Sequence, residues 1–335
     1  MSMLRTLTPY RMWNAMKLYT SFRKSKRTKR ADLSALPISI SVEPTTSCNL
    51  RCPECPSGLR SFSRATGMMS EELFRKITDD VKSHVMYMNF YFQGEPFLNP
   101  KLTEMIRYAH EKKIFTSTST NAHYLDEENS RKIVESKLDR LIISIDGSTQ
   151  ETYAAYRIGG TLSKVIEGTK NIVAMKQKMK SRTPEIVFQM LVVKPNEHQV
   201  HEIQALAEKL EVDDVVLKTA QVYEYENGNE LIPDNEAYSR YKRNETGRWE
   251  LKNELEDHCW KMWHSCVVTW DGSVVPCCFD KDAHHKLGTL KNFSFKEVWF
   301  SEPYKKFREA VLTGRKQIDI CKNCSEGSHV YAGSE

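Results

Sequence analysis

The chain has 335 residues, of which 40% are hydrophobic and 28% charged, which suits a globular protein with one large and one small domain. No apolar run approaches the ~18 residues that a membrane-spanning helix needs, and no secretory signal follows the basic N-terminus. The nine cysteines form an odd, locally clustered set, which favours metal ligation in a reducing compartment over a disulfide framework. These features predict a cytoplasmic protein.

Residues 1–36 form a basic N-terminal segment. Of the 49 Lys and Arg, nine fall in residues 1–31, which contain none of the 44 Asp and Glu, so the rest of the chain has a net charge of −4. Large apolar side chains recur there at helical spacing: Met12, Met16, Tyr19 and Phe22, beside Trp13. We expect a helix packed on the outside of the main domain. The alternatives are contact with a membrane surface or an acidic partner, and RNA binding.

From residue 37, β-rich runs alternate with amphipathic stretches. Strands are expected at 38–43, 86–93, 114–120, 140–146, 185–193 and 214–222. Helices are expected at 70–83, 99–113, 125–137, 161–180 and 196–210. Six β-α units with nearly continuous apolar strands indicate a parallel α/β sheet with right-handed crossovers, either doubly wound or closed toward a barrel.

Composition divides the rest of the chain. We expect the main α/β core at 37–225, a polar linker at 226–254 with a short helix near 234–243, and a cysteine-rich segment at 255–335. Because the body of the chain is net acidic, we expect no nucleic-acid partner.

Three cysteines follow the first expected strand with the spacing C-x3-C-x2-C: Cys48, Cys52 and Cys55. Three thiolates so close in one loop can hold three corners of a four-iron, four-sulfur cluster. No fourth cysteine lies nearby, so one iron would stay open for chemistry. The alternatives are a zinc site, which needs a fourth nearby ligand, and a disulfide framework.

Polar motifs close the next three expected strands. They are Gly94-Glu95-Pro96 after Gln93, Thr118-Ser119-Thr120-Asn121, and Ser144-Ile145-Asp146-Gly147 followed by Arg157. Each has an ordinary structural interpretation as well, because Gly, Pro, Asn and Ser end strands and Asp can cap a helix. Gln189 and Lys218 are expected near the same edge, either facing a substrate or as satisfied polar groups.

The cysteine spacing and these motifs together resemble the radical S-adenosylmethionine (radical SAM) superfamily. The resemblance implies an open (β/α)6 partial TIM barrel, with the site at the C-terminal strand ends. It implies that SAM binds the open iron and contacts Gly94, Glu95, Pro96, Thr120, Asn121, Ser144, Asp146 and Arg157. Gln93 departs from the family's usual Gly-Gly-Glu-Pro, where it replaces the first glycine.

Six more cysteines lie near the C-terminus: Cys259, Cys266, Cys277, Cys278, Cys321 and Cys324. Asp271-Gly272 predicts a tight hairpin turn that leads to Cys277. The segment resembles the SPASM/twitch extension of radical SAM enzymes, which implies an auxiliary cluster. Six cysteines are too few for two such clusters, and the best match for one is Cys259, Cys277, Cys321 and Cys324. Cys266 and Cys278 are then expected to be small buried hydrophobes. Two alternatives stay open: Cys278 as a ligand in place of Cys277, and a tetrahedral zinc ion in place of the cluster.

The resemblance therefore implies an enzyme with two [4Fe-4S] clusters, which cleaves SAM reductively to a 5′-deoxyadenosyl radical and abstracts hydrogen from a substrate. A net two-electron oxidation of a small molecule, sugar or membrane-associated intermediate is expected, with an electron donor such as flavodoxin or ferredoxin. One alternative is a maturase of a peptide or protein side chain. Another is an iron–sulfur electron carrier or scaffold without SAM chemistry. The N-terminal segment leaves open a peripheral location at the membrane.

Overall fold

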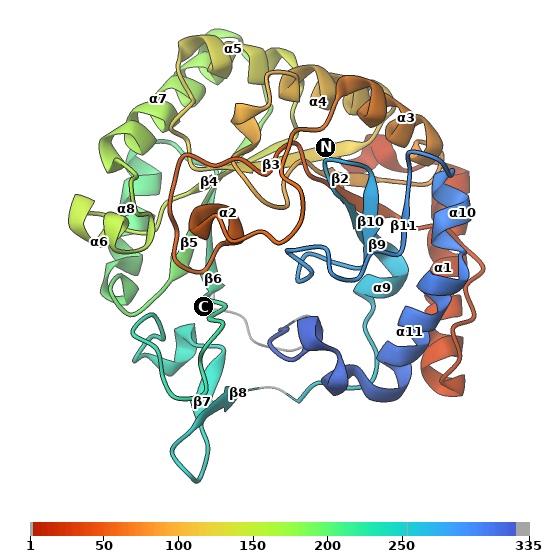
Figure 1. Cartoon of the computed structure of the whole chain (residues 1–335). Helices are drawn as coiled ribbons and strands as arrows, with labels where there is room; N and C mark the ends of the chain where they lie inside the picture. Colours follow the sequence, from red (N-terminus) through yellow and green to blue (C-terminus); the bar gives the residue numbers. More distant parts are fainter. Residues whose placement is uncertain (1–2, 253, 326–335) are drawn as a thin grey trace.

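The structure, a computed structural model, describes residues 3–252 and 254–325. Six parallel strands pair in chain order and curve into an open barrel (Figure 1). A doubly wound sheet would reverse its strand order part-way, and this one does not. The strands are β1 (Ser39–Val42), β2 (Tyr87–Asn89), β3 (Phe115–Thr120), β4 (Arg140–Ser144), β5 (Glu185–Val192) and β6 (Asp214–Thr219).

Helices connect these strands and cover the outer side of the barrel (Figure 1). Each expected helix is present: α3 (Glu71–Val81), α4 (Leu102–Glu111), α5 (Glu127–Glu135), α7 (Leu162–Lys178), and η3 (Glu197–Gln199) with α8 (Val200–Lys209). Ser70 caps α3 as predicted, because its hydroxyl accepts a hydrogen bond from the Leu73 amide. The sequence pattern did not predict α6 (Gln150–Tyr156), a two-turn helix that begins with a capping box between Thr149 and Thr152.

The C-terminal segment continues the same sheet. β9 (Ser265–Val268) lies parallel to β1, and β10 (Ser273–Val275) and β11 (Gly288–Thr289) follow as antiparallel neighbours. The predicted hairpin turn between β9 and β10 is confirmed: Gly272 has a φ of 82°, which glycine adopts at little cost. The described part of the segment also holds three α-helices, α9 (Lys261–His264), α10 (Phe295–Trp299) and α11 (Glu302–Gly314), and two 3-10 turns, η5 (Arg315–Gln317) and η6 (Asp319–Cys321).

Between barrel and C-terminal segment lies an antiparallel hairpin of β7 (Tyr241–Arg243) and β8 (Trp249–Leu251), preceded by the 3-10 turn η4 (Glu236–Tyr238). Of the short helix expected near 234–243, only this 3-10 turn forms, and the chain after it extends into β7. The chain reverses at a turn in which Gly247 has a φ of 79°. Tyr241 is buried in this hairpin, and its hydroxyl donates to the side-chain oxygen of Asn323 (2.9 Å). The hairpin thereby joins the end of the barrel to the last cysteine pair.

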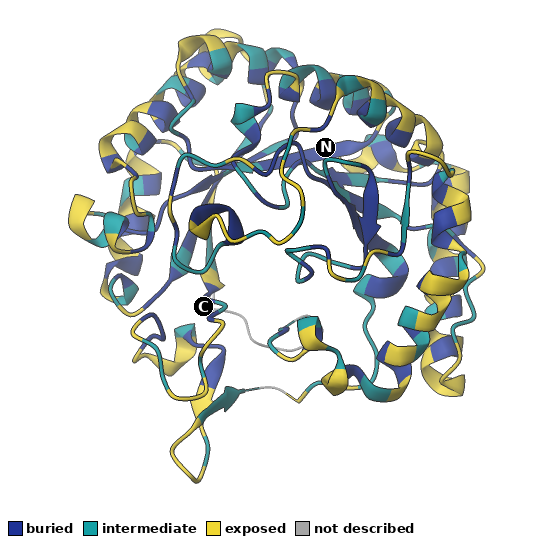
Figure 2. Cartoon of the chain, viewed as in Figure 1, coloured by how far each residue is buried: buried dark blue, intermediate teal, exposed yellow. Residues whose placement is uncertain are grey.

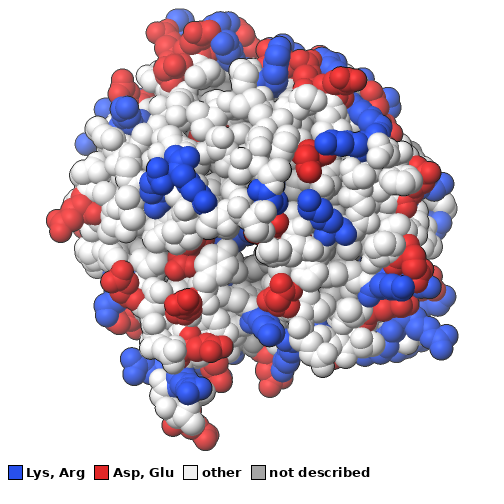
Figure 3. Space-filling view, in the orientation of Figure 1, with Lys and Arg blue, Asp and Glu red and all other residues white. Residues whose placement is uncertain are grey.

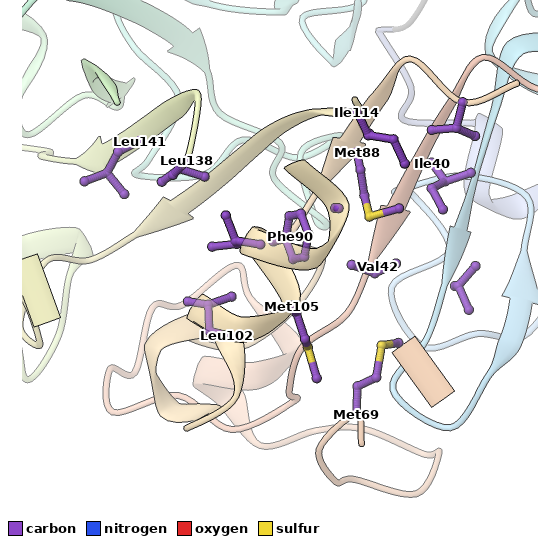
Figure 4. Packing of buried hydrophobic residues seen from close by; sticks show 14 of the residues in the cluster. Ile40, Val42, Met69, Met88, Phe90, Leu102, Met105, Ile114, Leu138 and Leu141 are labelled. Carbon is purple, nitrogen blue, oxygen red and sulfur yellow. The ribbon is translucent and has the colours of Figure 1, made fainter. Parts of the chain in front are cut away.

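A hydrophobic core lies between the strands and the outer helices (Figures 2 and 4). Five side chains there are fully buried: Ile40 and Val42 on β1, Met88 on β2, Phe90 just after β2, and Met105 on α4. Burial of each such side chain contributes about 1.5–3 kcal/mol. This packing supports the strands from outside and so holds their carboxyl ends in place.

The N-terminal helix α1 (Pro9–Thr28) follows the 3-10 turn η1 (Met3–Thr6) and packs on the body, as expected, but through another face. Its buried residues are mostly polar: Arg11, Asn14, Leu18, Ser21 and Ser25. Its expected inward residues are mostly exposed: Met12, Trp13, Met16 and Tyr19. None of the helices in the described ranges is long and apolar enough to cross a membrane.

Backbone hydrogen bonds explain why the polar face of α1 is the buried one. The Arg11 guanidinium donates to four backbone carbonyls, those of Thr6, Lys82, Lys112 and Lys113 (2.6–3.1 Å). The Asn14 side chain exchanges two hydrogen bonds with the backbone of Leu36. Within the expected apolar series, Phe22 packs inward, against Trp260 and Trp263. Pairing of otherwise unsatisfied carbonyls thus overrides the hydrophobic pattern.

We expect Arg11→Ala to lower the free energy of unfolding by about 3 kcal/mol, because it leaves buried carbonyls without donors. Urea unfolding measures this loss. The matched control is Arg23→Ala on the same helix, where the side chain is exposed, and its effect should stay within about 0.5 kcal/mol. Equal effects of the two variants would contradict the anchoring role of Arg11.

Candidate active site and auxiliary cysteine site

The loop after β1 places Cys48, Cys52 and Cys55 in one pocket with the carboxyl ends of the neighbouring strands. The pocket has a volume of about 360 Å3. Of the expected contact residues, its lining includes Gly94, Glu95, Thr120, Asn121, Ser144 and Arg157. The structure therefore brings together residues that are more than 100 positions apart in the sequence.

Gly94 sits where the end of β2 meets the cysteine loop. Its φ is 76°, and a Cβ there would lie 2.4 Å from the carbonyl oxygen of Thr45. Only glycine fits such an approach without displacing backbone. The Gly94 amide donates to the Ser57 hydroxyl (2.8 Å), and the Glu95 amide donates to the Ser47 carbonyl (2.8 Å). The motif thus fixes the loop that carries the thiols.

The carboxylate of Glu95 is buried and joins two strand ends. It accepts hydrogen bonds from the Thr120 hydroxyl (2.7 Å), the Asn121 amide (2.8 Å) and the Phe97 amide (3.2 Å). Burial raises the pKa of Glu95 to about 7, although these donors act in the opposite direction. A cation bound beside it would favour the ionised form and lower that pKa again.

Arg157 follows α6 and lies at the wall of the pocket. Its Nε donates to Asp146, and its Nη1 lies 3.8 Å from the sulfur of Cys52. Asp146 is fully buried and also accepts from the Leu191 amide (2.7 Å). Asp146 is absent from the pocket lining, so its carboxylate orients Arg157. The guanidinium remains able to face an anionic group in the pocket.

Two other expected residues lie outside the lining. Pro96 begins the 3-10 turn η2 (Pro96–Leu98), and Lys218 is exposed on β6. Gln189 does line the pocket. Lys218 pairs with Leu191 and so shares the face of Gln189, but β6 is the edge strand of the sheet, and the Lys218 side chain is exposed there.

The sequence analysis missed several lining residues, among them Tyr91, Tyr156, Glu54 and Lys281. Lys281 comes from the loop after β10, and its Nζ lies 4.7 Å from the ring of Tyr223 and 3.5 Å from the Glu54 carbonyl oxygen. It forms no ion pair within the described residues. No local signal marks it, because its place depends on the pairing of β9 with β1.

The C-terminal cysteines form a second, separate site. An enclosed pocket is lined by Cys259, Cys277, Cys321 and Cys324, together with Met262, Phe279, Phe307, Val311 and Ile320. These are the four cysteines expected for one auxiliary cluster. Lys261 and Arg315 also line this pocket, and four thiols that share one pocket fit a four-iron, four-sulfur cluster. Within the described ranges, no three Cys, His, Asp or Glu side chains are arranged to hold a single metal ion.

Arg315 adds a cation to this second site, and the sequence analysis missed it. Its Nη2 lies 3.5 Å from the sulfur of Cys324, and its Nη1 donates to the His258 carbonyl (2.8 Å). Burial alone would lower the pKa of Arg315, but the neighbouring thiols raise it. A fixed guanidinium there offsets the negative charge of thiolates.

The two spare cysteines lie in different surroundings. Cys266 on β9 is buried in the core, and burial raises the pKa of its thiol to about 12, as expected for an inert small hydrophobe. Cys278 is partly buried and is absent from the lining of the auxiliary pocket. The geometry favours Cys277 over Cys278 as the auxiliary ligand.

Comparison with known families agrees with these two sites. The radical SAM superfamily matches residues 42–207, and the SPASM iron–sulfur cluster-binding domain matches residues 259–325. The chain belongs to the radical SAM superfamily. SAM and [4Fe-4S] clusters are therefore its cofactors.

This radical SAM protein is similar to several known proteins over most of its length. The tungsten-containing aldehyde ferredoxin oxidoreductase cofactor-modifying protein of Pyrococcus furiosus is 25% identical over 319 residues, covering 85% of this chain and 86% of the relative. BtrN in complex with AdoMet and 2-DOIA is 19% identical, covering 90% of this chain and 98% of BtrN, with a TM-score of 0.56. SuiB of Streptococcus suis bound to S-adenosylmethionine is 14% identical, covering 92% and 76%, with a TM-score of 0.66. The two structural likenesses show the common fold.

We expect Cys277→Ala to remove the auxiliary iron, about four atoms per chain, while the matched variant Cys278→Ala keeps it. The reason is that only Cys277 faces the other three thiols of the pocket. Iron analysis of the anaerobically reconstituted variants measures the difference. Iron loss in Cys278→Ala with retention in Cys277→Ala would reverse the assignment.

Proposed function

We propose that this radical SAM enzyme carries out a net two-electron oxidation, with the SAM-binding cluster on Cys48, Cys52 and Cys55. The observation that carries the proposal is that three thiols share a pocket with the polar strand ends, while four others share a separate enclosed pocket. An incomplete thiol set leaves an iron open, and a complete one does not. The two sites therefore support different tasks.

Cys48, Cys52 and Cys55 would hold the cluster, which together with SAM would supply the radical chemistry that removes a hydrogen atom from the substrate. The residues of the chain position and enclose the reactants. Glu95 and Thr120 hold the ends of β2 and β3 together, so Asn121 faces the pocket in a fixed position. Arg157, oriented by Asp146, would offer its guanidinium to the carboxylate of SAM.

The auxiliary site would take up the second electron. A hydrogen atom removed from a substrate leaves a radical, which must lose one more electron and a proton to complete a two-electron oxidation. The apolar walls of the auxiliary pocket, including Phe307 and Val311, exclude water from the four thiols. Arg315 beside Cys324 favours a site that gains negative charge.

A small molecule is our leading substrate, as BtrN with 2-DOIA and the cofactor-modifying relative of Pyrococcus furiosus suggest. Lys281, Gln189 and Tyr91 give the pocket polar and aromatic walls for such a ligand. The second candidate is a peptide side chain, supported by the likeness to SuiB bound to its precursor peptide SuiA, with a TM-score of 0.66. A flavodoxin or ferredoxin in the cytoplasm would supply the reducing electron.

The first test replaces Cys48, Cys52 and Cys55 together by Ala. We expect SAM cleavage to 5′-deoxyadenosine under dithionite to stop, and iron to fall from about eight to about four atoms per chain. The auxiliary cluster should stay visible by absorption spectroscopy. Persistent SAM cleavage in this variant would sink the assignment, and absence of cleavage in the reconstituted wild type would favour an electron carrier or scaffold.

A second test separates the structural role of Arg157 from its cofactor role. Arg157→Met alone should destabilise the protein by about 3–5 kcal/mol, because Asp146 is left as an unpaired buried charge. Adding Asp146→Asn should restore most of that stability, because the amide oxygen can still accept from the Leu191 amide. The double variant should nevertheless bind SAM about tenfold more weakly, measured by calorimetry. Wild-type SAM affinity in the double variant would show that Arg157 acts only on the fold.

A further inference from the structure

The N-terminal segment exposes an unusual number of large apolar side chains. Eight of them in η1, α1 and the turn between are between 47% and 70% exposed: Met3, Leu4, Leu7, Tyr10, Met12, Trp13, Met16 and Tyr19. We call this set the apolar face of α1. It accounts for eight of the fifteen exposed large hydrophobics in the described residues, and clustered apolar exposure of this kind marks an interaction surface.

The helix that carries this face is firmly held, so the exposure does not arise from a loose segment. Arg11 and Asn14 bond to the backbone of the body on the opposite side of the helix. The ring of Phe22 packs against both Trp260 and Trp263 of the body. The inward face is therefore satisfied mostly by polar contacts, and the apolar side chains of the other face are exposed.

Basic side chains continue the apolar face toward the C-terminal end of α1. Met12, Met16, Tyr19, Arg23 and Arg27 are spaced by four, three, four and four residues, which aligns them on one side of a helix. Among the described residues, Arg23 and Arg27 have no carboxylate partner, whereas Lys24 pairs with Asp32. In Figure 3, Lys and Arg side chains gather beside acidic ones at the lower right, where α1 ends in Figure 1.

We propose that the apolar face of α1, with Arg23 and Arg27, docks this enzyme on an anionic lipid surface. Trp, Tyr and Met side chains enter the boundary between headgroups and acyl chains, and Arg side chains meet the phosphates. Of the nine basic residues in 1–31, Arg5, Lys24 and Lys26 pair with carboxylates and Arg11 is buried. Arg23 and Arg27 are exposed beside the apolar face, and their charge complements an anionic membrane. A second copy would set the same basic segment against itself, and like charges across an interface oppose association.

The position of the segment keeps the active-site pocket accessible. Arg5 and Arg11 donate to the carbonyls of Lys82, Lys112 and Ile114, which precede β2 and β3. These contacts lie at the amino ends of the strands, whereas the cysteine pocket lies at the carboxyl ends. Docking through α1 therefore leaves the SAM pocket away from the lipid, and it goes beyond the proposed oxidation chemistry.

The test is flotation of the full-length reconstituted protein with two kinds of vesicle, pure phosphatidylcholine and phosphatidylcholine mixed with phosphatidylglycerol. We expect the protein to float with the anionic vesicles only, and less as salt is raised. Trp13→Ser with Met16→Ser, and separately Arg23→Glu with Arg27→Glu, should weaken binding about tenfold or more. The matched charge control is Lys170→Glu with Lys209→Glu, two exposed lysines on α7 and α8, which should bind like the wild type.

Three results would overturn the proposal. The first is no flotation with anionic vesicles at low salt. The second is a loss of vesicle binding in the Lys170/Lys209 control equal to that in the Arg23/Arg27 variant, which would mean that binding depends only on the net charge of the protein. The third is a wild-type dimer in light scattering that Trp13→Ser with Met16→Ser makes monomeric, which would assign the face to a second copy. SAM cleavage by the α1 variants is measured in parallel and should be unchanged, so failure of docking and failure of the oxidation chemistry are distinguishable.

Discussion

The parallel pairing of β9 with β1 is the contact on which the rest of the structure depends. It joins residues 265–268 to residues 39–42 and makes one continuous sheet from the barrel and the C-terminal segment. Glu43, directly after β1, reinforces the junction: its buried carboxylate accepts from the Arg64 guanidinium and from the Trp270 amide. A buried ion pair needs such complete hydrogen bonding to offset its desolvation. One carboxylate therefore holds the strand, the far end of the cysteine loop and the β9–β10 hairpin together.

This junction also ties the chain near both cysteine sets to one carboxylate. Arg64 follows the three cysteines of the loop, Trp270 precedes Cys277, and both donate to Glu43. Lys281, beyond Cys277, reaches the wall of the barrel pocket. The C-terminal segment thus contributes both the auxiliary thiols and part of the space where a substrate would lie. Each thiol set also has one arginine within 4 Å of a sulfur, the half-buried Arg157 at Cys52 and the buried Arg315 at Cys324.

The N-terminal helix shows how backbone demands can override a hydrophobic pattern. The loops before β2 and β3 end in carbonyls that the sheet does not pair, and Arg11 supplies donors for them. An unpaired buried carbonyl costs more than an exposed methionine, since much of any protein surface is apolar. The helix therefore turns its Arg, Asn and Ser inward, and Met12, Trp13 and Met16 remain outside.

The sequence by itself determined the order of strands and helices in the core and the β9–β10 hairpin, because neighbouring residues carry local periodicity and turn chemistry. The strand pattern alone left a doubly wound sheet possible, and the open barrel and the set of four C-terminal cysteines followed from the resemblance to the radical SAM superfamily. Tertiary structure alone decided that Lys281 lines the first pocket and that Arg315 lies beside Cys324 in the second. It also decided that Asp146 orients Arg157 and that α1 packs through its polar face. The physical reason is that these outcomes depend on hydrogen-bond partners and strand pairings tens to hundreds of residues away, which no local pattern records.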